Sequence, residues 1–279
     1  MIVAATQHDV QSFLKKQTGK SIGLVPTMGC LHAGHLSLVE RSQAENDLTL
    51  VSIFVNPTQF SNPEDLQNYP RTLEQDQNML RQAGVDLLFC PQPEVMYPPG
   101  TATQVVVQGT ALPLEGAYRP GHFAGVATVV SKLFHILQPN RAYFGNKDYQ
   151  QVKVIEQFTR DLNFPVSIVP CETQREADGL ALSSRNLRLN TAQRQACPVL
   201  HRSLQFALER LQAGETDLEG LRLEMEVMIL EAGLARIDYI AFNHAITLAP
   251  ATEAQAPLLV SLAVFYGPVR LIDNLVWQG

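Results

Sequence analysis

Hydrophobic and polar positions alternate in two rhythms over the first 175 residues of this 279-residue chain. Short apolar runs, typical of buried strands, separate longer stretches in which apolar residues recur every three or four positions, as on one face of a helix. The pattern predicts strands at 22–25, 48–55, 85–89, 104–107, 141–144 and 166–169, and helices that begin at 35 and cover 72–83, 122–137 and 148–162. This alternation predicts an α/β fold, a Rossmann-like parallel sheet with helices on both faces.

The pattern changes after a polar loop at 178–186. Helical stretches follow, and three apolar runs then lie close together in the sequence, which favours a short antiparallel sheet. The helical stretches are 191–213 and 216–232, and the apolar runs are 237–242, 258–265 and 269–271. We therefore expect a Rossmann-like catalytic domain over 1–175 and a smaller C-terminal α+β domain, placed as a lid, over 176–279.

The composition narrows the class of protein. Hydrophobic residues make up 46% of the chain, enough for a buried core, and no stretch is long and apolar enough to span a membrane. Because the N-terminus lacks the order of a signal peptide and the four cysteines have no Cys-x-x-Cys spacing, we expect a cytoplasmic protein with reduced thiols. A net charge of −6 argues against a nucleic-acid surface, so an anionic ligand would depend on a few local cations.

The segment 26–35, PTMGCLHAGH, carries the strongest functional signal. It joins a predicted strand to a predicted helix, and it places His32 and His35 one helical turn apart beside Gly29 and Gly34. Small turn residues let the backbone approach a ligand, and the free N–H groups of a helix N-terminus favour a phosphate. Two imidazoles there can donate hydrogen bonds, or a proton, to a phosphoryl group. The segment therefore predicts a nucleotide site.

Two other interpretations of this region are weaker. The histidine pair could be half of a metal site, but no nearby Cys, His or acidic residue has the spacing that zinc needs, so we expect no protein-bound metal. The segment 18–21, TGKS, looks like the tail of a P-loop. It fails as one because Leu14 stands where the first glycine is required and because the segment precedes its strand.

The segment 54–60, FVNPTQF, ends the second predicted strand and so reaches the same carboxyl edge of the sheet. The amides of Asn56 and Gln59 suit the hydroxyls and carboxylate of a small polar molecule. A turn stabilised by asparagine and proline is the alternative.

The segment 145–151, GNKDYQQ, also follows a strand and begins a helix. Lys147 would thus lie at a helix N-terminus, where a point cation suits a phosphate. Asp148 could either cap this helix or bind a ribose hydroxyl. Gln151, one turn later, could face the same cleft as Gln59.

The loop at 175–186 could close over a site in the first domain, since Ser183, Ser184 and Arg185 make a compact set of phosphate-binding side chains. Serine and arginine are also common in ordinary loops. Before the predicted helix 122–137, Arg119 and His122 are further candidates for an anionic substrate, or they simply mark the start of that helix.

Acidic residues of the predicted helix 72–83 offer one more candidate. Glu74 and Asp76 could help to hold a magnesium ion, but a solvated helix face explains them more simply. Thr72 and Gln75 have the spacing of a capping box at the start of this helix.

Five segments in a fixed order resemble the pantoate–β-alanine ligase family, part of the HxGH nucleotidylyltransferase superfamily. They are PTMGCLHAGH, FVNPTQF, YRPGHF, FGNKDYQQ and READGLALSSRN, which lie between residues 26 and 186. The resemblance covers nearly the whole chain. The resemblance implies that ATP and (R)-pantoate form an enzyme-bound pantoyl adenylate with release of diphosphate. The amine of β-alanine then displaces AMP to give pantothenate. The resemblance also implies Mg²⁺ accompanying ATP and a homodimer formed through the first domain.

The resemblance also implies roles for individual residues. His35 would donate a proton to the departing diphosphate, and His32 and Lys147 would stabilise charge on the phosphates. The residues implied to contact ATP are Met28, Gly29, Cys30, Leu31, His32, Ala33, Gly34, His35, Gly145, Asn146, Lys147, Asp148, Gln174 through its backbone, Leu182, Ser183, Ser184 and Arg185. The candidates for pantoate or β-alanine are Gln59, Gln151, Asn56, Arg119 and His122.

The chain departs little from the family pattern. Asn146 replaces a common glutamate, and Cys30 stands where alanine or asparagine is usual. Two alternatives stay open: an HxGH nucleotidylyltransferase that makes a stable nucleotide product, and a nucleotide-binding module without activity. The amides of 56, 59 and 151 favour a small hydroxy acid over the first alternative, and the presence of both histidines and Lys147 argues against the second.

Overall fold

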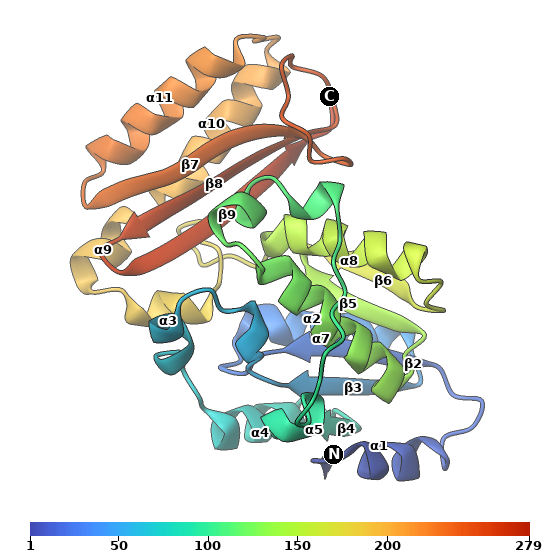
Figure 1. Ribbon diagram of the computed structural model, residues 1–279. Helices are drawn as coiled ribbons and strands as arrows, with labels where there is room; N and C mark the ends of the chain where they lie inside the picture. Colours follow the sequence, from blue (N-terminus) through green and yellow to red (C-terminus); the bar gives the residue numbers. More distant parts are fainter.

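The computed structural model describes residues 1–279 and contains two sheets, coloured from blue to yellow-green and orange to red in Figure 1. The larger sheet has six strands in the order β1-β4-β3-β2-β5-β6, and all its pairs are parallel. Its strands are β1 Ile2–Ala4, β2 Ile22–Thr27, β3 Leu48–Ile53, β4 Leu87–Phe89, β5 Arg141–Gly145 and β6 Ser167–Cys171. The smaller sheet is antiparallel, with β7 Ala235–His244, β8 Leu258–Tyr266 and β9 Val269–Trp277.

Helices cover both faces of the larger sheet, which confirms the predicted fold class. Leu24 and Leu50 pack into one apolar cluster with α1, α7 and α8, whereas their neighbours Val25 and Val51 pack into another with α2 and α4. This division follows from strand geometry, because successive side chains point to opposite faces. The helices of this part are α1 Gln7–Leu14, α2 Ala33–Glu45, α3 Pro63–Gln67, α4 Leu73–Gln82, α5 Pro93–Met96, α6 Glu115–Tyr118, α7 His122–Leu137 and α8 Tyr149–Asp161.

A separate apolar cluster forms beneath the antiparallel sheet. It joins β7, β8 and β9 to α10 and α11, which cover the side of this sheet turned away from the larger one (Figure 1). The helices here are α9 Thr191–Ala196, α10 Val199–Gln212 and α11 Leu218–Glu231. No helix in the structure combines the length and the apolar character that crossing a membrane requires.

The two sheets are tied together by buried ion pairs. Glu115 of α6 is 6% exposed, and it accepts hydrogen bonds from both terminal nitrogens of Arg270 in β9, at 2.7 and 2.8 Å, and from the hydroxyl of Tyr239 in β7. Burial alone would raise the pKa of Glu115, but Arg270 holds it below its usual value. A carboxylate that remains ionised in a dry site needs such a partner, so each sheet depends on the other here.

The order of the strands fixes the place of a ligand site. β2 pairs with β3 on one side and with β5 on the other, so the chain leaves the centre of the sheet in both directions. In open α/β sheets the crevice at such a switch point, beyond the carboxyl ends of the strands, receives ligands. Both the 26–35 and the 145–151 segments lie at this crevice.

Several expected elements are absent or different. Residues 104–107 form no strand, although their side chains alternate in burial as those of a strand would, because no neighbour pairs with them. Pro198 divides the stretch 191–213 into α9 and α10. The one-turn helix α5 lies inside the proline-rich 91–100 loop, and β1 and α1 lie in a region for which the pattern predicted no element.

The predicted capping box at the start of α4 is wrong. Thr72 is the N-cap residue, but its side chain makes no capping hydrogen bond. Its hydroxyl donates instead to a carboxylate oxygen of Asp76, at 3.1 Å. The Thr72 hydroxyl is used in this way because Asp76 supports the candidate active site, as described below.

Candidate active site

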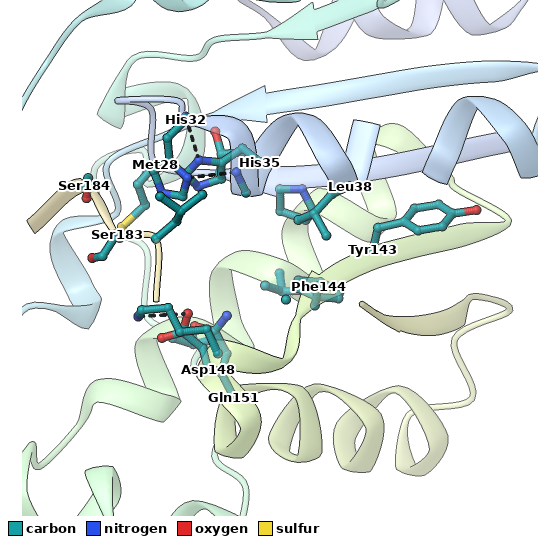
Figure 2. Close-up of a pocket in the computed structure, with 18 of the residues that line it drawn as sticks. Met28, His32, His35, Leu38, Tyr143, Phe144, Asp148, Gln151, Ser183 and Ser184 are labelled. Atoms are coloured by element: carbon teal, nitrogen blue, oxygen red, sulfur yellow. Dashed lines mark hydrogen bonds and ion pairs between the residues drawn. The ribbon is translucent and has the colours of Figure 1, made fainter. Parts of the chain in front are cut away.

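A cavity of about 220 Å³ opens at the carboxyl edge of the larger sheet. Figure 2 shows Met28, His32 and His35 on one side of it, Asp148 and Gln151 across from them, and the segment of Ser183 and Ser184 beside both. Most of the residues expected at a site line this cavity: Met28, His32, Gly34, His35, Asn56, Gln59, Gly145, Lys147, Asp148, Gln151, Gln174, Leu182, Ser183, Ser184 and Arg185. Gly29, Cys30, Leu31, Ala33, Asn146, Arg119 and His122 do not line it.

The loop between β2 and α2 is held in an unusual backbone conformation. Gly29 has φ +83° and Cys30 has φ +52°, so the chain passes through the left-handed region twice in succession. Such a bend leaves the N–H groups of Cys30 and Leu31 pointing to one side, where the carboxylate of Asp76 accepts both, at 2.9 and 2.8 Å. Glycine is favoured at position 29, because the backbone there is left-handed and a Cβ would lie 3.1 Å from Asp76.

Asp76 therefore supports the site in a way that the sequence analysis did not predict, since it was expected on a solvated helix face or as a magnesium ligand. It is 1% exposed, whereas Glu74 on the same helix is exposed, so only one of the two acidic residues lies on a solvated face. With both oxygens engaged by the loop and by Thr72, Asp76 braces the segment that carries the histidines. Its position on the buried stripe of α4, in phase with Leu80, was the available signal.

The two histidines stack with their ring centroids 4.1 Å apart at the start of α2. The Nδ1 atom of His32 accepts the backbone N–H of Gly34 at 3.2 Å, and the Nδ1 atom of His35 accepts that of His32 at 3.3 Å. A neutral imidazole that accepts at Nδ1 carries its proton on Nε2. Both rings therefore have an Nε2–H group available as a donor.

The electrostatic surroundings keep these rings neutral. Burial, followed by the positive charges available on His32 and Lys147, lowers the pKa of His35 to about 3. Burial and Lys147 also lower the pKa of His32, against a smaller opposing effect of Asp148. At neutral pH in the absence of ligand, the pair thus offers hydrogen bonds and carries no additional proton to give away.

The turn after β5 carries Lys147 and Asp148 in a short 3-10 helix, η3 Asn146–Asp148. The Lys147 amine lies 3.8 Å from the carboxylate of Asp148. Asp148 occupies the N-cap position of α8 but makes no capping hydrogen bond, so the capping alternative is not what the structure shows. The side chain lines the cavity instead, as Figure 2 shows.

Asn56 has a different role from the one that its chemistry suggested. It is 1% exposed, its amide donates to the Gln59 side chain at 2.9 Å and to the Gly125 carbonyl at 3.1 Å, and its oxygen accepts from Thr58 and Tyr97. These bonds use both of its hydrogens. Asn56 thus stabilises the turn η1 Pro57–Gln59 and orients Gln59.

Gln59 keeps a hydrogen for a ligand. Its Oε1 accepts from Asn56, and one hydrogen of Nε2 points to the Met28 sulfur at 3.2 Å, which is a weak acceptor. Opposite, Gln151 lines the cavity, whereas its neighbour Gln150 is buried in bonds to the 109–115 segment.

Arg119 and His122 lie behind Gln59 and outside the main cavity. His122 Nδ1 donates to the backbone oxygen of Gln59 at 2.8 Å, and Arg119 reaches the same oxygen at 3.4 Å. Both line a smaller adjoining cavity, which shares Lys147, Asp148 and Gln151 with the main one. Direct contact with a ligand in the main cavity, as expected for these two residues, is therefore not what the geometry favours.

An apolar wall completes the cavity. Val126, Val129, Val130 and Leu133 of α7 line it together with Phe54 at the end of β3. No sequence motif indicated this wall, because the same residues read as the ordinary buried face of a helix.

The segment of Ser183, Ser184 and Arg185 lies over the cavity at the start of η4 Ser184–Arg188. The Ser183 hydroxyl accepts the backbone N–H of Arg185, and Arg185 pairs with Asp65 of α3 at 2.9 Å. Part of the guanidinium is thus already engaged. Asp65 also pairs with Arg188 at 3.0 Å, so it holds two arginines of this segment.

The side chains of the site include no group of three or more His, Cys, Asp or Glu that converge as metal ligands. Asp76, one of the two candidates for magnesium, has its oxygens committed to backbone N–H groups.

Two histidines that open the helix after the central strand of a parallel sheet define the HxGH nucleotidylyltransferase superfamily. Within that class, the sequence profile described as pantoate-beta-alanine ligase matches residues 2–276. The chain belongs to the pantoate–β-alanine ligase family, as its five motifs predicted.

Curated relatives and solved structures agree with this assignment. The chain is 53% identical to pantothenate synthetase of Moorella thermoacetica, over 99% of this chain and 97% of that protein. It is 51% identical to pantothenate synthetase of Herpetosiphon aurantiacus, over 99% and 100%. The crystal structure of pantothenate synthetase from Thermus thermophilus superposes with a TM-score of 0.95 at 46% identity, over 100% of both chains. A Francisella tularensis pantoate-beta-alanine ligase, complexed with beta-gamma ATP and beta-alanine, superposes with a TM-score of 0.84 at 38% identity, over 99% and 97%.

Proposed function

We propose that this protein is an ATP-dependent ligase that condenses (R)-pantoate with β-alanine to give pantothenate, AMP and diphosphate. In the first step the pantoate carboxylate attacks the α-phosphorus of ATP, and the bond to diphosphate breaks. In the second step the β-alanine amine attacks the acyl carbon, and AMP leaves. A carboxylate is a poor acyl donor until it carries such a leaving group, and adenylation provides one without a covalent bond to the enzyme.

The observation that carries the proposal is the mixed lining of the cavity. It combines the amides of Gln59 and Gln151 with the apolar side chains of α7 and Phe54. Pantoate carries both kinds of group, two hydroxyls and a carboxylate together with two methyl groups. The amides would fix its orientation, while the apolar side chains would enclose its methyl groups and exclude water.

The phosphates would lie between the start of α2 and Lys147. There the Nε2–H groups of His32 and His35, the Lys147 ammonium and the N-terminus of α2 all offer donors to negative charge. Because the Nδ1 atom of His35 accepts the His32 N–H and leaves its Nε2–H group free, we assign His35 a hydrogen bond to the departing diphosphate, and a substitution described below tests the proton transfer that the resemblance implied. Ser183, Ser184 and the free part of Arg185 would contact the phosphates from the other side.

The remaining nucleotide contacts follow from position. Met28, Gly34, Gly145 and Asp148 line the cavity, and Asp148 would accept a hydrogen bond from a ribose hydroxyl. Gln174 and Leu182 are joined by a backbone hydrogen bond of 2.9 Å and would lie beside adenine. Gly29, Cys30, Leu31, Ala33 and Asn146 shape the two loops from within.

We propose that Mg²⁺ enters as part of the ATP substrate. The site fits this because its donors to the phosphates are cationic or neutral and leave the phosphate oxygens to the ion, while no carboxylate cluster competes for it. The ion would neutralise part of the phosphate charge.

Arg119, His122 and Asn56 would act on the substrates through Gln59. Asn56 orients the Gln59 side chain, and Arg119 and His122 hold its backbone oxygen. Arg119 and His122 line the adjoining cavity together with Asp148.

We also propose that the protein is a homodimer formed through the first domain. As expected from the sequence, we place the domain boundary at residue 175 and propose a cytoplasmic location. The support is the segment 104–107, whose residues alternate in burial although they lack a pairing strand. Val106 is 60% exposed there, and Leu112 and Tyr118 are exposed nearby. An unpaired apolar edge of this kind is covered most simply by the same edge of a second copy.

The test of the dimer is sedimentation of the protein and of its Val106→Lys variant. We expect a dimer for the unaltered protein and a monomer for the variant, because a buried lysine pair at the interface would repel. Val227→Lys, at a similarly exposed valine of α11, is the control and should remain dimeric. An unaltered protein that sediments as a monomer would refute the proposal.

The test of the activity is release of AMP and diphosphate from Mg·ATP, with pantoate and β-alanine omitted in turn. We expect diphosphate to require pantoate, and AMP and pantothenate to require both substrates. Nucleotide turnover that is indifferent to pantoate would refute the proposal and favour a different adenylyl acceptor.

A further inference from the structure

Strand β9 of the smaller sheet contacts both segments that face the proposed phosphate site, the Lys147 turn (residues 146–148) and the segment from Arg175 to Arg185. Figure 1 shows β9 as the strand of that sheet nearest to the larger one. Two consecutive residues of β9 make the polar contacts. We call Asp273 and Asn274 the β9 pair.

Asn274 holds the Lys147 turn from behind. Its side-chain nitrogen donates to the backbone oxygen of Asn146 at 3.0 Å and to that of Lys147 at 2.8 Å. Both amide hydrogens are thus given to two consecutive carbonyls of one turn, and Asn274 is only 8% exposed. Two bonds from one planar amide fix the orientation of the peptide from which the Lys147 side chain leaves.

Asp273 holds the other segment. Both of its oxygens accept from Arg175, at 2.6 and 2.9 Å, and it is 3% exposed. Arg175 also donates to the Gly179 carbonyl at 3.1 Å, and it pairs with Ala181 in a short antiparallel bridge. Gly179 and Ala181 lie just before Ser183 in the chain. Through Arg175, Asp273 therefore fixes the position of the backbone that leads to Ser183.

The pair is joined within itself. Asp273 Oδ1 also accepts the backbone N–H of Asn274, at 2.8 Å. This bond ties the Asp273 carboxylate to the strand backbone from which the Asn274 side chain leaves. Bidentate arginine–carboxylate contacts have a fixed geometry, and in a buried position they are costly to break.

We propose that the β9 pair positions the Lys147 turn against the Ser183–Arg185 segment, so that the C-terminal sheet is part of the adenylation machinery. This rests on the proposed function, and Asp273 and Asn274 act through Lys147 and Arg175, since they line the adjoining cavity and not the main one. The reason is one of distance: displacing a charge-stabilising group by about 1 Å can cost about a hundredfold in rate. The β9 pair links the two segments outside the main cavity.

The decisive variant is Asn274→Asp, which keeps the shape of the side chain but turns an anionic oxygen toward two carbonyls. Asn243→Asp is the matched control, because Asn243 lies in the same sheet, is 2% exposed and donates to the Leu248 carbonyl at 2.8 Å, away from the site. We expect pantoate-dependent diphosphate release to fall about a hundredfold in Asn274→Asp and less than about threefold in Asn243→Asp. Both should lower the melting temperature. If Asn274→Asp does not fold, Asn274→Ala removes the same bonds without the charge.

A second measurement separates positioning from loss of structure. Asn274→Asp is combined with Lys147→Ala, and single-turnover rates are followed with radiolabelled ATP. If Asn274 acts through Lys147, the second substitution should cost less than about threefold once Lys147 is gone. A cost that remains a hundredfold in the double variant, or normal adenylation in folded Asn274→Asp and Asn274→Ala, would overturn the proposal.

Failure of the proposed function would look different. In that case the unaltered protein would release no diphosphate with pantoate, whatever the variants do. The shift in melting temperature on adding Mg·ATP would then test the β9 pair by itself, since Lys147 faces the cavity under any assignment of the acceptor. We expect the shift to be smaller in Asn274→Asp than in Asn243→Asp, and equal shifts would overturn the proposal.

Discussion

The loop that carries His32 and His35 and the turn that carries Lys147 occupy equivalent places but are supported in opposite ways. Each ends one of two paired strands, β2 and β5, and each begins a helix. The histidine loop has its N–H groups bound from behind by the carboxylate of Asp76, whereas the Lys147 turn has its carbonyls bound from behind by the amide of Asn274. An acceptor holds the first and a donor holds the second.

The two supports also differ in where they come from. Asp76 belongs to α4, which packs on the larger sheet in the same apolar layer as the loop that Asp76 holds. Asn274 comes from the other sheet. The geometry of the histidines is therefore an internal property of the parallel sheet, while that of Lys147 depends on how the second sheet is seated. Variants can test this separation from either side.

The largest effect is expected at His35. We predict that His35→Ala lowers the rate of adenylation about a thousandfold while the fold is kept, because it removes a donor aimed at charge that develops on the phosphates. His35→Gln, which keeps an N–H donor, should recover at least about tenfold of the loss. Pre-steady-state diphosphate release measures both rates. A glutamine variant as slow as the alanine variant would show that His35 transfers a proton after all.

A smaller effect is expected at Asp76. We predict that Asp76→Asn slows adenylation about a hundredfold, because the amide nitrogen that replaces one carboxylate oxygen cannot accept a backbone N–H group and the loop will shift. Glu74→Gln, on the exposed side of the same helix, is the control and should be within about twofold of the unaltered protein. The measurement is the rate of diphosphate release at saturating ATP. Equal rates for the two variants would mean that the loop holds its own shape.

The smallest effect concerns stability against acid. Burial lowers the pKa of His35 to about 3 and, with Arg119 nearby, that of His122 to about 4. Both rings are neutral in the folded state, whereas in the unfolded chain they take up protons below about pH 6.5. Above that pH these two histidines do not reduce the free energy of unfolding. As the pH falls from about 6.5 toward the pKa values of the folded state, proton uptake by the unfolded chain lowers it. Each histidine should lower the free energy of unfolding by about 1.4 kcal/mol per pH unit in this range.

Urea unfolding at several pH values between 7 and 4.5 measures this loss. We predict that His122→Gln flattens the decline by about 1.4 kcal/mol per pH unit, and that replacing the exposed His135 leaves it unchanged. A decline of equal slope in the two variants would show that other groups cause it.

The sequence analysis predicted neither of these two supports. The hydrophobic periodicity predicted strands β2 to β6 of the larger sheet. The glycines beside two histidines at the end of a predicted strand indicated the site. Asp76 was read together with Glu74 as a solvated face, because single acidic residues on a helix are ordinarily solvated, and only the phase with Leu80 distinguished them. Asn274 carried no signal at all, since an asparagine in a strand has no preferred partner until the fold supplies one.

Amides and apolar residues posed a different difficulty. Asn56 and Gln59 have the same chemistry, and only the surrounding bonds reveal that one is used up by the turn and the other is available. The residues of α7 that line the cavity are indistinguishable in sequence from those that fill the core. The predicted strand at 104–107 shows the reverse case, in which burial alternates as in a strand but no neighbouring strand pairs with the segment.

The bonds from Asn274 also concern the order in which the chain is made. Lys147 and Asn274 are 127 residues apart, whereas Cys30 and Asp76 are 46 apart. On the ribosome, the histidine loop can be braced as soon as α4 has emerged. A nascent chain that already contains every side chain facing the phosphates would still have an unsupported Lys147 turn until β9 is synthesised. The Lys147 turn therefore reaches its final geometry only when the chain is nearly complete, later than the histidine loop does.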